Sequence, residues 1–227
     1  MVDFNKLRST KPKAQPVEPA EILRRLPKPA GFNDLYTSQS DVLKTWFEDR
    51  DTADVVIKLH TGGGKTLVGL LMAQSTLNEI KSPVLYLAPT TQLVSQTIER
   101  AKQFGIPAVP YMRGAPLHED FLNSKAVMVA TYSALFHGMS KFGLAGSPDV
   151  VSVGAIILDD AHSAFSDVRE KFTLNVDASK SPQQYKACAT CSGCHYATPA
   201  KRARSTTSFQ IETSAYLRSH TLPGGKI

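Results

Sequence analysis

The sequence lacks long apolar runs, an apolar leader and the length that two large domains need. No stretch approaches the roughly 18 consecutive apolar residues of a membrane-spanning helix, which excludes an integral membrane protein. The N-terminal residues hold neither an apolar block nor a small-residue cleavage site, so they do not predict a secretory signal. At 227 residues the chain has room for one sizeable core, and two full α/β domains do not fit comfortably. We expect a cytoplasmic protein with reduced cysteines.

Acidic residues are scarce at both ends of the chain. The formal net charge is +6, yet the middle of the chain holds ten Lys and Arg against thirteen acids, while residues 1–30 hold seven against three and residues 163–227 nine against four. A slightly acidic middle argues against a basic nucleic-acid surface over the whole domain. The basic flanks are typical of solvated tails. Five of the fourteen prolines lie in residues 1–30, so we expect a Pro-rich basic linker over 1–31.

Between residues 32 and 176 apolar runs alternate with helical patterns. The runs expected to be strands are 55–59, 84–88, 126–131 and 155–158, and the helices between them are 66–80 and 91–104. Nearly continuous apolar runs are typical of strands buried on both faces of a parallel sheet. The sequence therefore predicts a three-layer α/β domain with a mainly parallel sheet and crossover helices.

This pattern stops after Asp177. Only five of the last 51 residues are Ile, Leu, Val, Phe or Met, while thirteen are Ser or Thr. Such a segment buries too little apolar surface to offset its ordering entropy, so we expect residues 177–227 to form a poorly ordered tail. The change in composition is also typical of a truncation junction or an altered reading frame.

The strongest motif is LHTGGGKT, residues 59–66, between an expected strand and an expected helix. Consecutive glycines let backbone N–H groups turn inward onto a phosphate, and the following helix adds its free N-terminal donors. Lys65 would reach the β- and γ-phosphates of a nucleotide, and the Thr66 hydroxyl would hold Mg²⁺. The phosphate-loop pattern has glycine at its first position, where this chain has Leu59. The alternative is a glycine-rich turn with an exposed lysine.

A second motif, AIILDDAH, covers residues 155–162. Asp159, at the carboxyl end of an apolar strand, is placed to hold Mg²⁺ opposite the phosphate loop. The next acid, Asp160, can orient or deprotonate the attacking water. Taken alone, two aspartates after a strand can also be a solvated turn, but a phosphate loop upstream favours the nucleotide site.

Together these motifs resemble the first RecA-like domain of superfamily 2 helicases, the DEAD/DEAH-box group, over residues 32–165. LHTGGGKT is similar to motif I of that group, and Asp-Asp-Ala-His at 159–162 to motif II in a DExH-type form. The resemblance implies ATP and Mg²⁺ as cofactors and DNA or RNA as the partner. It implies a cofactor-binding set and a catalytic set of residues. The cofactor-binding set is Gln39, Thr61, Gly62, Gly63, Gly64, Lys65 and Thr66. The catalytic set is Lys65, Asp159, Asp160 and His162, with Thr66 and Asp159 as Mg²⁺ ligands.

The resemblance extends to two further strings, APTTQL at 88–93 and ATYSAL at 130–135, which line the single-strand track in that group. The residues so implied to bind nucleic acid are Pro89, Thr90, Thr91, Gln92, Thr131 and Tyr132. Gln39 stands where the group places a glutamine that recognises adenine. Each of these assignments has a plainer alternative. The residues at 89–92 and 131–132 can simply be loop residues after strands, and Gln39 can be an exposed polar residue at the start of a helix.

Two departures from the group limit what the resemblance implies. Asp160 stands where most relatives have glutamate, and its side chain is one methylene shorter. The group also works with a second RecA-like domain, which supplies an arginine finger and half of the nucleic-acid track, and nothing after Asp177 resembles it. His162, by resemblance, would couple the nucleotide to the nucleic-acid side.

The tail contains two weaker motifs. Residues 196–199, Tyr-Ala-Thr-Pro, resemble motif III of the group, but no apolar strand precedes them. The cysteines Cys188, Cys191 and Cys194, followed by His195, have a spacing that suits the start of a zinc or iron–sulfur site, or haem attachment. A second ligand pair is missing, which favours free cysteines.

The sequence therefore predicts an ATP-binding RecA-like domain of a helicase or translocase. When a second such domain or subunit completes it, Mg-ATP hydrolysis would drive movement on a nucleic acid. The alternative from another class is a non-catalytic module that binds nucleotide or nucleic acid and presents its basic flanks to a partner. A third alternative is a different phosphate-loop enzyme, such as a kinase. The strings at 88–93 and 159–162 argue against it, because such an enzyme does not require them.

Overall fold

The structure is a computed structural model. It describes residues 15–32, 34–60, 62–137, 140–142, 150–177, 179–190, 197–199 and 208–212. The chain divides into two compact units, Met1–Ala164 and Phe165–Ile227. Within the described residues, every helix is too short or too polar to cross a membrane.

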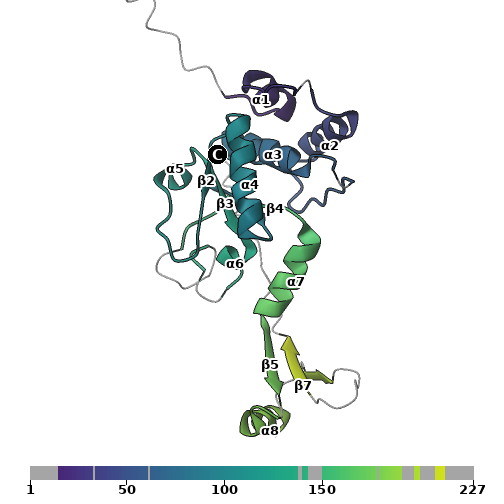
Figure 1. Ribbon diagram of the computed structural model, residues 1–227, viewed down its shortest axis with the longest axis vertical. Helices are drawn as coiled ribbons and strands as arrows, with labels where there is room; N and C mark the ends of the chain where they lie inside the picture. The colour runs from purple at the N-terminus through teal and green to yellow at the C-terminus, as the bar shows by residue number, and fades with distance from the viewer. Residues whose placement is uncertain are drawn as a thin grey trace, which may run out of the picture. The chain divides into compact units, whose positions relative to one another are not determined.

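A parallel four-stranded sheet forms the centre of the first unit (Figure 1). Strand β1 (Val84–Ala88) pairs on one side with β3 (Val127–Thr131) and on the other with β4 (Ala155–Leu158). The short strand β2 (Ala108–Pro110) pairs with the far side of β3. All five residues of β1 are buried, as expected for a central strand covered on both faces. The predicted α/β class with a mainly parallel sheet is confirmed, and the predicted bounds of β1 and β4 are correct.

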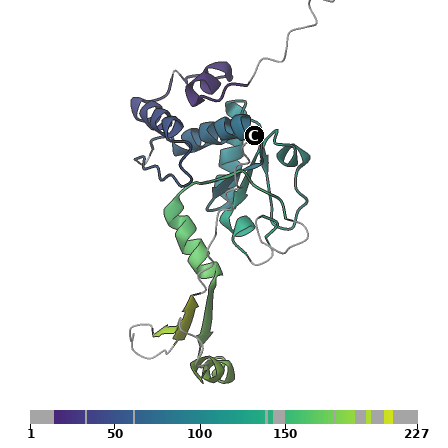
Figure 2. The ribbon, with the colours of Figure 1, turned by 180° about the vertical axis from the view of Figure 1, so that it is seen from behind.

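Successive side chains along the strands point to opposite faces of the sheet, and each face has its own hydrophobic core. Helices α3 (Lys65–Ile80) and α4 (Thr91–Gln103) cover the face that carries Val84 and Tyr86, and both figures show them side by side (Figures 1 and 2). The other face carries Leu85 and Leu87. Aromatic residues of the segments between β2 and β4 fill that side, namely Tyr111, Phe121, Tyr132 and Phe142. The short helices α5 (Glu119–Leu122) and α6 (Tyr132–Leu135) belong to those segments.

The N-terminal segment differs from the linker that the sequence predicts. Residues Pro19–Arg25 form helix α1, with proline in its first turn, where the missing N–H costs nothing. Ile22 and Leu23 are buried against α3 and join the main core. Apolar residues at positions 19, 22, 23 and 26 follow a helical period that the prolines around them conceal. The folded part therefore begins before Phe32. The first 14 residues lie outside the described part.

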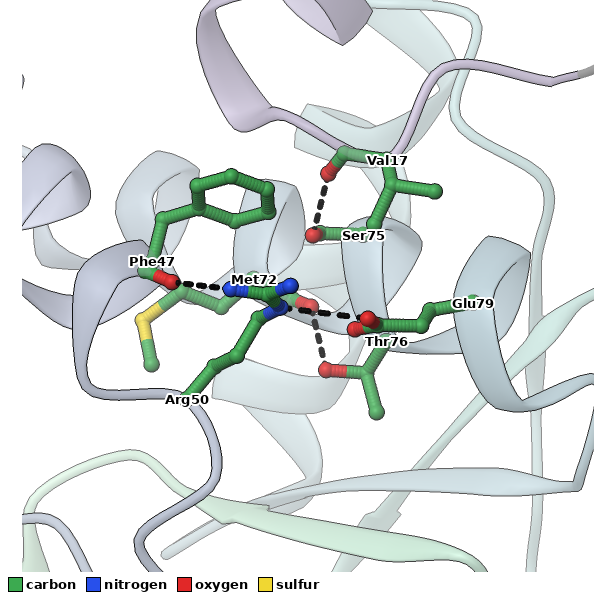
Figure 3. A network of polar contacts seen from close by, with 7 residues as sticks. All are labelled: Val17, Phe47, Arg50, Met72, Ser75, Thr76 and Glu79. Carbon is green, nitrogen blue, oxygen red and sulfur yellow. Dashed lines mark hydrogen bonds and ion pairs between the residues drawn. The ribbon is translucent and has the colours of Figure 1, made fainter.

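Polar contacts also hold the N-terminal segment and α2 (Thr37–Glu48) onto α3 (Figure 3). The Ser75 hydroxyl donates to the Val17 carbonyl. The Arg50 guanidinium donates to the Phe47 carbonyl at 2.8 Å and to Glu79 Oε1 at 3.1 Å. These bonds satisfy backbone groups around α3, the helix that carries the phosphate loop.

The strand expected over residues 55–59 is wrong. These residues have no regular secondary structure, and Val56 is 90% exposed. Strand β4 is the last strand of the sheet, and within the described residues none pairs with its outer edge. Residues 55–59 do not pair with that open edge, so their apolar run gains no strand hydrogen bonds. Leu59 packs against the core only in part.

The second unit holds a small antiparallel sheet in which β7 (Ser208–Glu212) pairs with both β5 (Thr173–Asp177) and β6 (Ala197–Pro199). Helix α8 (Pro182–Thr190) lies between β5 and β6 in the chain. Helix α7 (Ala161–Lys171) begins in the first unit and ends in the second. The expected poor order of 177–227 stays a prediction. Of the motif III string, Tyr196 lies outside the described residues and 197–199 form β6.

Candidate nucleotide-binding site

The phosphate loop leads directly into the N-terminus of α3. Gly62 and Gly64 have φ of +81° and +68°, a backbone conformation that side chains disfavour. The Gly63 N–H donates to the His60 carbonyl at 3.1 Å, which closes the turn. Lys65 is the first residue of the helix and its side chain is exposed. The free N–H groups and positive dipole end of this 16-residue helix suit an anion at the loop. Thr61 lies outside the described residues.

Gln39 is buried and connects the loop to α2. Its Oε1 accepts from the Tyr36 N–H at 3.0 Å, and its Nε2 donates to the Gly63 carbonyl at 2.9 Å. Gln39 therefore holds the loop in place from a helix 24 residues earlier. The second N–H of its amide takes part in neither of these two bonds and can serve a ligand.

A cavity of about 490 Å³ adjoins this connection. It is lined by Tyr36, Thr37, Ser38, His60 and Gly62. The Tyr36 ring is 70% exposed beside it, which offers an aromatic face to a planar ligand. Sequence reasoning missed Tyr36 and His60, although an aromatic residue three positions before Gln39 was a usable signal.

Asp159 follows β4 directly and lies beside the phosphate loop. Its N–H donates to the Leu87 carbonyl at 2.8 Å, which extends the pairing of β4 with β1 by one bond. Burial raises the pKa of the Asp159 carboxyl, and a hydrogen bond from Tyr86 opposes that rise. The Asp160 charge raises this pKa further and the Lys65 charge lowers it. The structure thus brings the predicted loop lysine and the predicted metal ligand into electrostatic range of each other.

Asp160 has a left-handed backbone, with φ of +60°, and caps helix α7. Its Oδ2 accepts from the Ser163 hydroxyl at 2.7 Å. This bond lowers the pKa of the Asp160 carboxyl, as do the Ser163 N–H and the nearby His162 and Lys65 charges. Aspartate tolerates a left-handed conformation better than most residues, because its short polar side chain bonds locally. His162 is exposed in the first turn of α7.

Two tyrosines that sequence analysis did not connect with the aspartates reach this edge of the sheet. The Tyr86 hydroxyl lies near the side chains of Asp159 and Thr66, and burial together with the Asp159 charge raises the pKa of this hydroxyl. The Tyr132 hydroxyl contacts the carbonyl oxygens of Asp159 and Asp160 and lies 2.9 Å from the latter. Buried tyrosines inside apolar runs give no sequence signal of such bonds, since they appear only when the strands are aligned.

The residues expected to contact nucleic acid lie at the carboxyl ends of β1 and β3. Thr90 caps α4, and its hydroxyl accepts from the Leu93 N–H at 3.2 Å. Thr91 and Gln92 are exposed, and Pro89 and Thr131 are half-buried. Tyr132 is buried, so its side chain serves the aspartate loop rather than the surface. Because the strands are parallel, these positions share one edge of the sheet with Asp159.

The donor set suits magnesium. The Thr66 hydroxyl and the Asp159 carboxylate are hard oxygen ligands, and Mg²⁺ prefers one or two protein oxygens plus water and phosphate. Among the described residues, no group of three or more His, Cys, Asp or Glu side chains gathers as a metal site. Cys191, Cys194, His195 and the Cys188 side chain lie outside the described part, so their metal binding stays untested.

Two comparisons with known proteins show which family the chain resembles. The family model for the DEAD/DEAH box helicase matches residues 36–203. A chloroplastic DEAD-box ATP-dependent RNA helicase of Arabidopsis thaliana, helicase 58, is 30% identical over 138 residues. That match covers 54% of this chain and 28% of the relative. The resemblance to a superfamily 2 helicase domain is confirmed, because the family model spans well over half of the chain. The chain therefore belongs to the DEAD/DEAH box helicase family.

Proposed function

We propose that the first unit binds Mg-ATP and, joined to a second RecA-like domain or subunit, couples ATP hydrolysis to nucleic-acid remodelling. The observation that carries this proposal is the place of Asp159 at the end of β4, within electrostatic range of Lys65 at the end of the phosphate loop. The loop and the end of β4 are thus near enough to act on one nucleotide and its cation.

Each residue has a role in the proposed site. The Gly62 to Gly64 backbone and the Lys65 ammonium hold the phosphates, since charge-assisted bonds of this kind are worth about 1.5–3 kcal/mol. Thr66 and Asp159 hold Mg²⁺, which when bound neutralises charge on the phosphates. Asp160 orients the attacking water, and its bond to Ser163 fixes its carboxylate close to the loop. His162 follows on the exposed side as the coupling residue of a DExH-type motif.

The adenine would lie in the cavity beside Gln39. Tyr36 can stack on its face, and the remaining amide N–H of Gln39 can donate to a ring nitrogen. Because Gln39 also holds the Gly63 carbonyl, a base bound there would steady the phosphate loop.

RNA is the nucleic acid we favour, since the Arabidopsis relative is named as an RNA helicase. Pro89, Thr90, Thr91, Gln92 and Thr131 line the proposed track at the carboxyl edge of the sheet. Hydroxyl, amide and backbone groups of this kind suit a phosphate backbone better than base edges. A cytoplasmic location stays a prediction.

The test is nucleotide binding by Lys65→Ala. Calorimetry with Mg-ATP should show binding to the wild-type chain and a loss of at least tenfold in affinity for the variant. Lys58→Ala is the matched control, because Lys58 is an exposed lysine just before the loop and should bind as the wild type does. Equal affinities for Lys65→Ala and Lys58→Ala would overturn the phosphate-loop assignment.

A second candidate is a nucleotide-binding module without catalysis. The observation in its favour is that Ser163 already occupies Oδ2 of Asp160. Phosphate release at saturating Mg-ATP and RNA separates the two. Turnover that is lost in Asp160→Asn supports the ATPase, whereas tight ATP binding with the same background release in both proteins supports the module.

A further inference from the structure

His60 serves the phosphate loop through its backbone and the adjoining cavity through its side chain. Its carbonyl accepts from the Gly63 N–H at 3.1 Å, so the turn does not depend on which side chain stands at position 60. The exposed imidazole lines the cavity of about 490 Å³ beside the loop. Pockets for small molecules span roughly 300–1,000 Å³, so this one has room for a planar ring. No step of the proposed nucleotide binding uses this imidazole.

The imidazole lies against the backbone of Gly63. A Cβ added to Gly63 would lie 3.3 Å from His60 Cε1 and 3.4 Å from its Nδ1. The absence of a side chain at Gly63 therefore makes the room in which the ring rests. Within the described residues the imidazole takes part in no hydrogen bond. Packing on Gly63, rather than a polar contact, sets the position of the ring.

One buried amide connects this ring to Tyr36. Gln39 accepts from the Tyr36 N–H at 3.0 Å through Oε1 and donates to the Gly63 carbonyl at 2.9 Å through Nε2. Gly63 in turn supports the His60 ring. Tyr36 and His60 come from segments far apart in the sequence, yet the same amide holds both backbones. Both side chains line one cavity, and Tyr36 is 70% exposed.

We propose that Tyr36 and His60 clamp the base of a purine nucleotide between their rings. The inference rests on the proposed function, because it concerns the base of the same nucleotide. Removing an aromatic side chain that stacks on a base typically weakens binding about 5- to 150-fold. Imidazole is a small ring, so the loss expected at His60 lies near the lower end of this range.

The bonds of Gln39 favour purines of either kind. Both heteroatoms of its amide are already bonded within the protein, which leaves one N–H as its remaining donor. Adenine and guanine share the N7 acceptor that such a donor can meet, whereas pyrimidines lack it. Every base also has a π-face, so we expect ADP and GDP to bind within about fivefold of each other and CDP to bind more weakly.

The experiment compares nucleotides with tripolyphosphate, which has phosphates and no base. Calorimetry with Mg²⁺ gives the affinities of the chain for ADP, GDP, CDP and tripolyphosphate. His60→Ala should lose about fivefold or more in ADP affinity and bind tripolyphosphate as the wild type does. His60→Phe restores a flat ring and should bind ADP as the wild type does. Val56→Ala is the matched control, since Val56 is 90% exposed on the same segment and lies outside the cavity lining.

Four results overturn the inference. Wild-type ADP affinity in His60→Ala means that the imidazole does not touch the base. Equal losses in His60→Phe and His60→Ala mean that the contact is a hydrogen bond and not stacking. Equal losses for ADP and tripolyphosphate in His60→Ala mean a structural role in the loop. An ADP affinity more than about tenfold above that for GDP means that the site reads the edge of the base. A wild-type chain that binds neither ADP nor tripolyphosphate overturns the proposed function, and the clamp with it.

Discussion

The Gln39 Nε2 donates to the Gly63 carbonyl across 24 residues of sequence, and a Cβ on Gly64 would lie only 2.2 Å from that same nitrogen. The amide and the loop therefore fit one another with no room for a side chain at the next position. This contact means that Gly62 and Gly64 are required for different reasons. Gly62 is needed for its conformation alone, whereas Gly64 is needed for its conformation and for space.

We predict that Gly64→Ala destabilises the domain more than Gly62→Ala does. Both variants place alanine in a left-handed conformation, at about 1–2 kcal/mol each. Only Gly64→Ala also displaces Gln39, because the space around Gly62 is open. Urea unfolding of the two variants measures the difference, and equal losses of stability would contradict the contact. In a Gln39→Ala background the extra cost of Gly64→Ala should disappear.

Helix α1 should contribute to stability as a core element. Ile22→Ala should cost about 2–5 kcal/mol, since Ile22 is buried against α3 and its truncation leaves a cavity. Ile80→Ala, at a half-exposed isoleucine at the end of α3, is the control and should cost much less. Chemical denaturation compares them. A cost for Ile22→Ala no larger than for Ile80→Ala would mean that the segment is a tail after all.

The adjacent threonines Thr90 and Thr91 should separate helix capping from nucleic-acid binding. Thr90→Ala removes the acceptor of the Leu93 N–H and should cost about 0.5–2 kcal/mol, whereas Thr90→Ser keeps the cap. Thr91→Ala should change stability by less than about 0.5 kcal/mol, because Thr91 is exposed. Thermal unfolding tests both. If both alanine variants weaken RNA binding in fluorescence anisotropy, the proposed track is supported; unchanged binding in both argues against it.

The chain 1–227 alone should show little ATP-dependent unwinding of a duplex. Stabilising the γ-phosphate in the transition state needs a cation opposite Lys65, and an arginine finger is worth about 10³–10⁵ in rate in other phosphoryl-transfer enzymes. The resemblance assigns that arginine to a second domain. A strand-displacement assay against Lys65→Ala gives the answer. Robust unwinding that the variant loses would mean that the chain supplies this cation itself, or does so by self-association.

Much of the fold could be predicted from the sequence, because the buried strands β1 and β4 are short apolar runs and α3 and α4 follow clear helical periods. The prediction failed at 55–59, where the apolar run pairs with no strand, and at α1, where prolines conceal the helical spacing of Ile22 and Leu23. Strand formation depends on neighbours that a local pattern cannot show.

The candidate site could likewise be predicted only in part. The loop and the aspartates carry motifs that predict one nucleotide site. Because no strand of the sheet precedes the loop, its place near Asp159 depends on how α3 packs against the sheet. The bond from Gln39 to Gly63, the bond from Ser163 to Asp160 and the place of Tyr86 near Asp159 carry no motif. They depend on which side chains meet once the helices and strands are in place, and single residues of these types are too common to predict it.

Strand β4 carries Asp159, yet within the described residues it is bonded to a neighbour on one side only. Its Ile156 and Leu158 are partly exposed, at 47% and 37%. Strands at a sheet margin open by local unfolding more readily than central ones. Amide hydrogen exchange in β4 should then be faster than in β1, and each opening would carry the aspartate away from the phosphate loop. A nucleotide that holds Asp159 through its cation would keep β4 paired with β1. Amide hydrogen exchange in β4 should therefore slow as the nucleotide site fills.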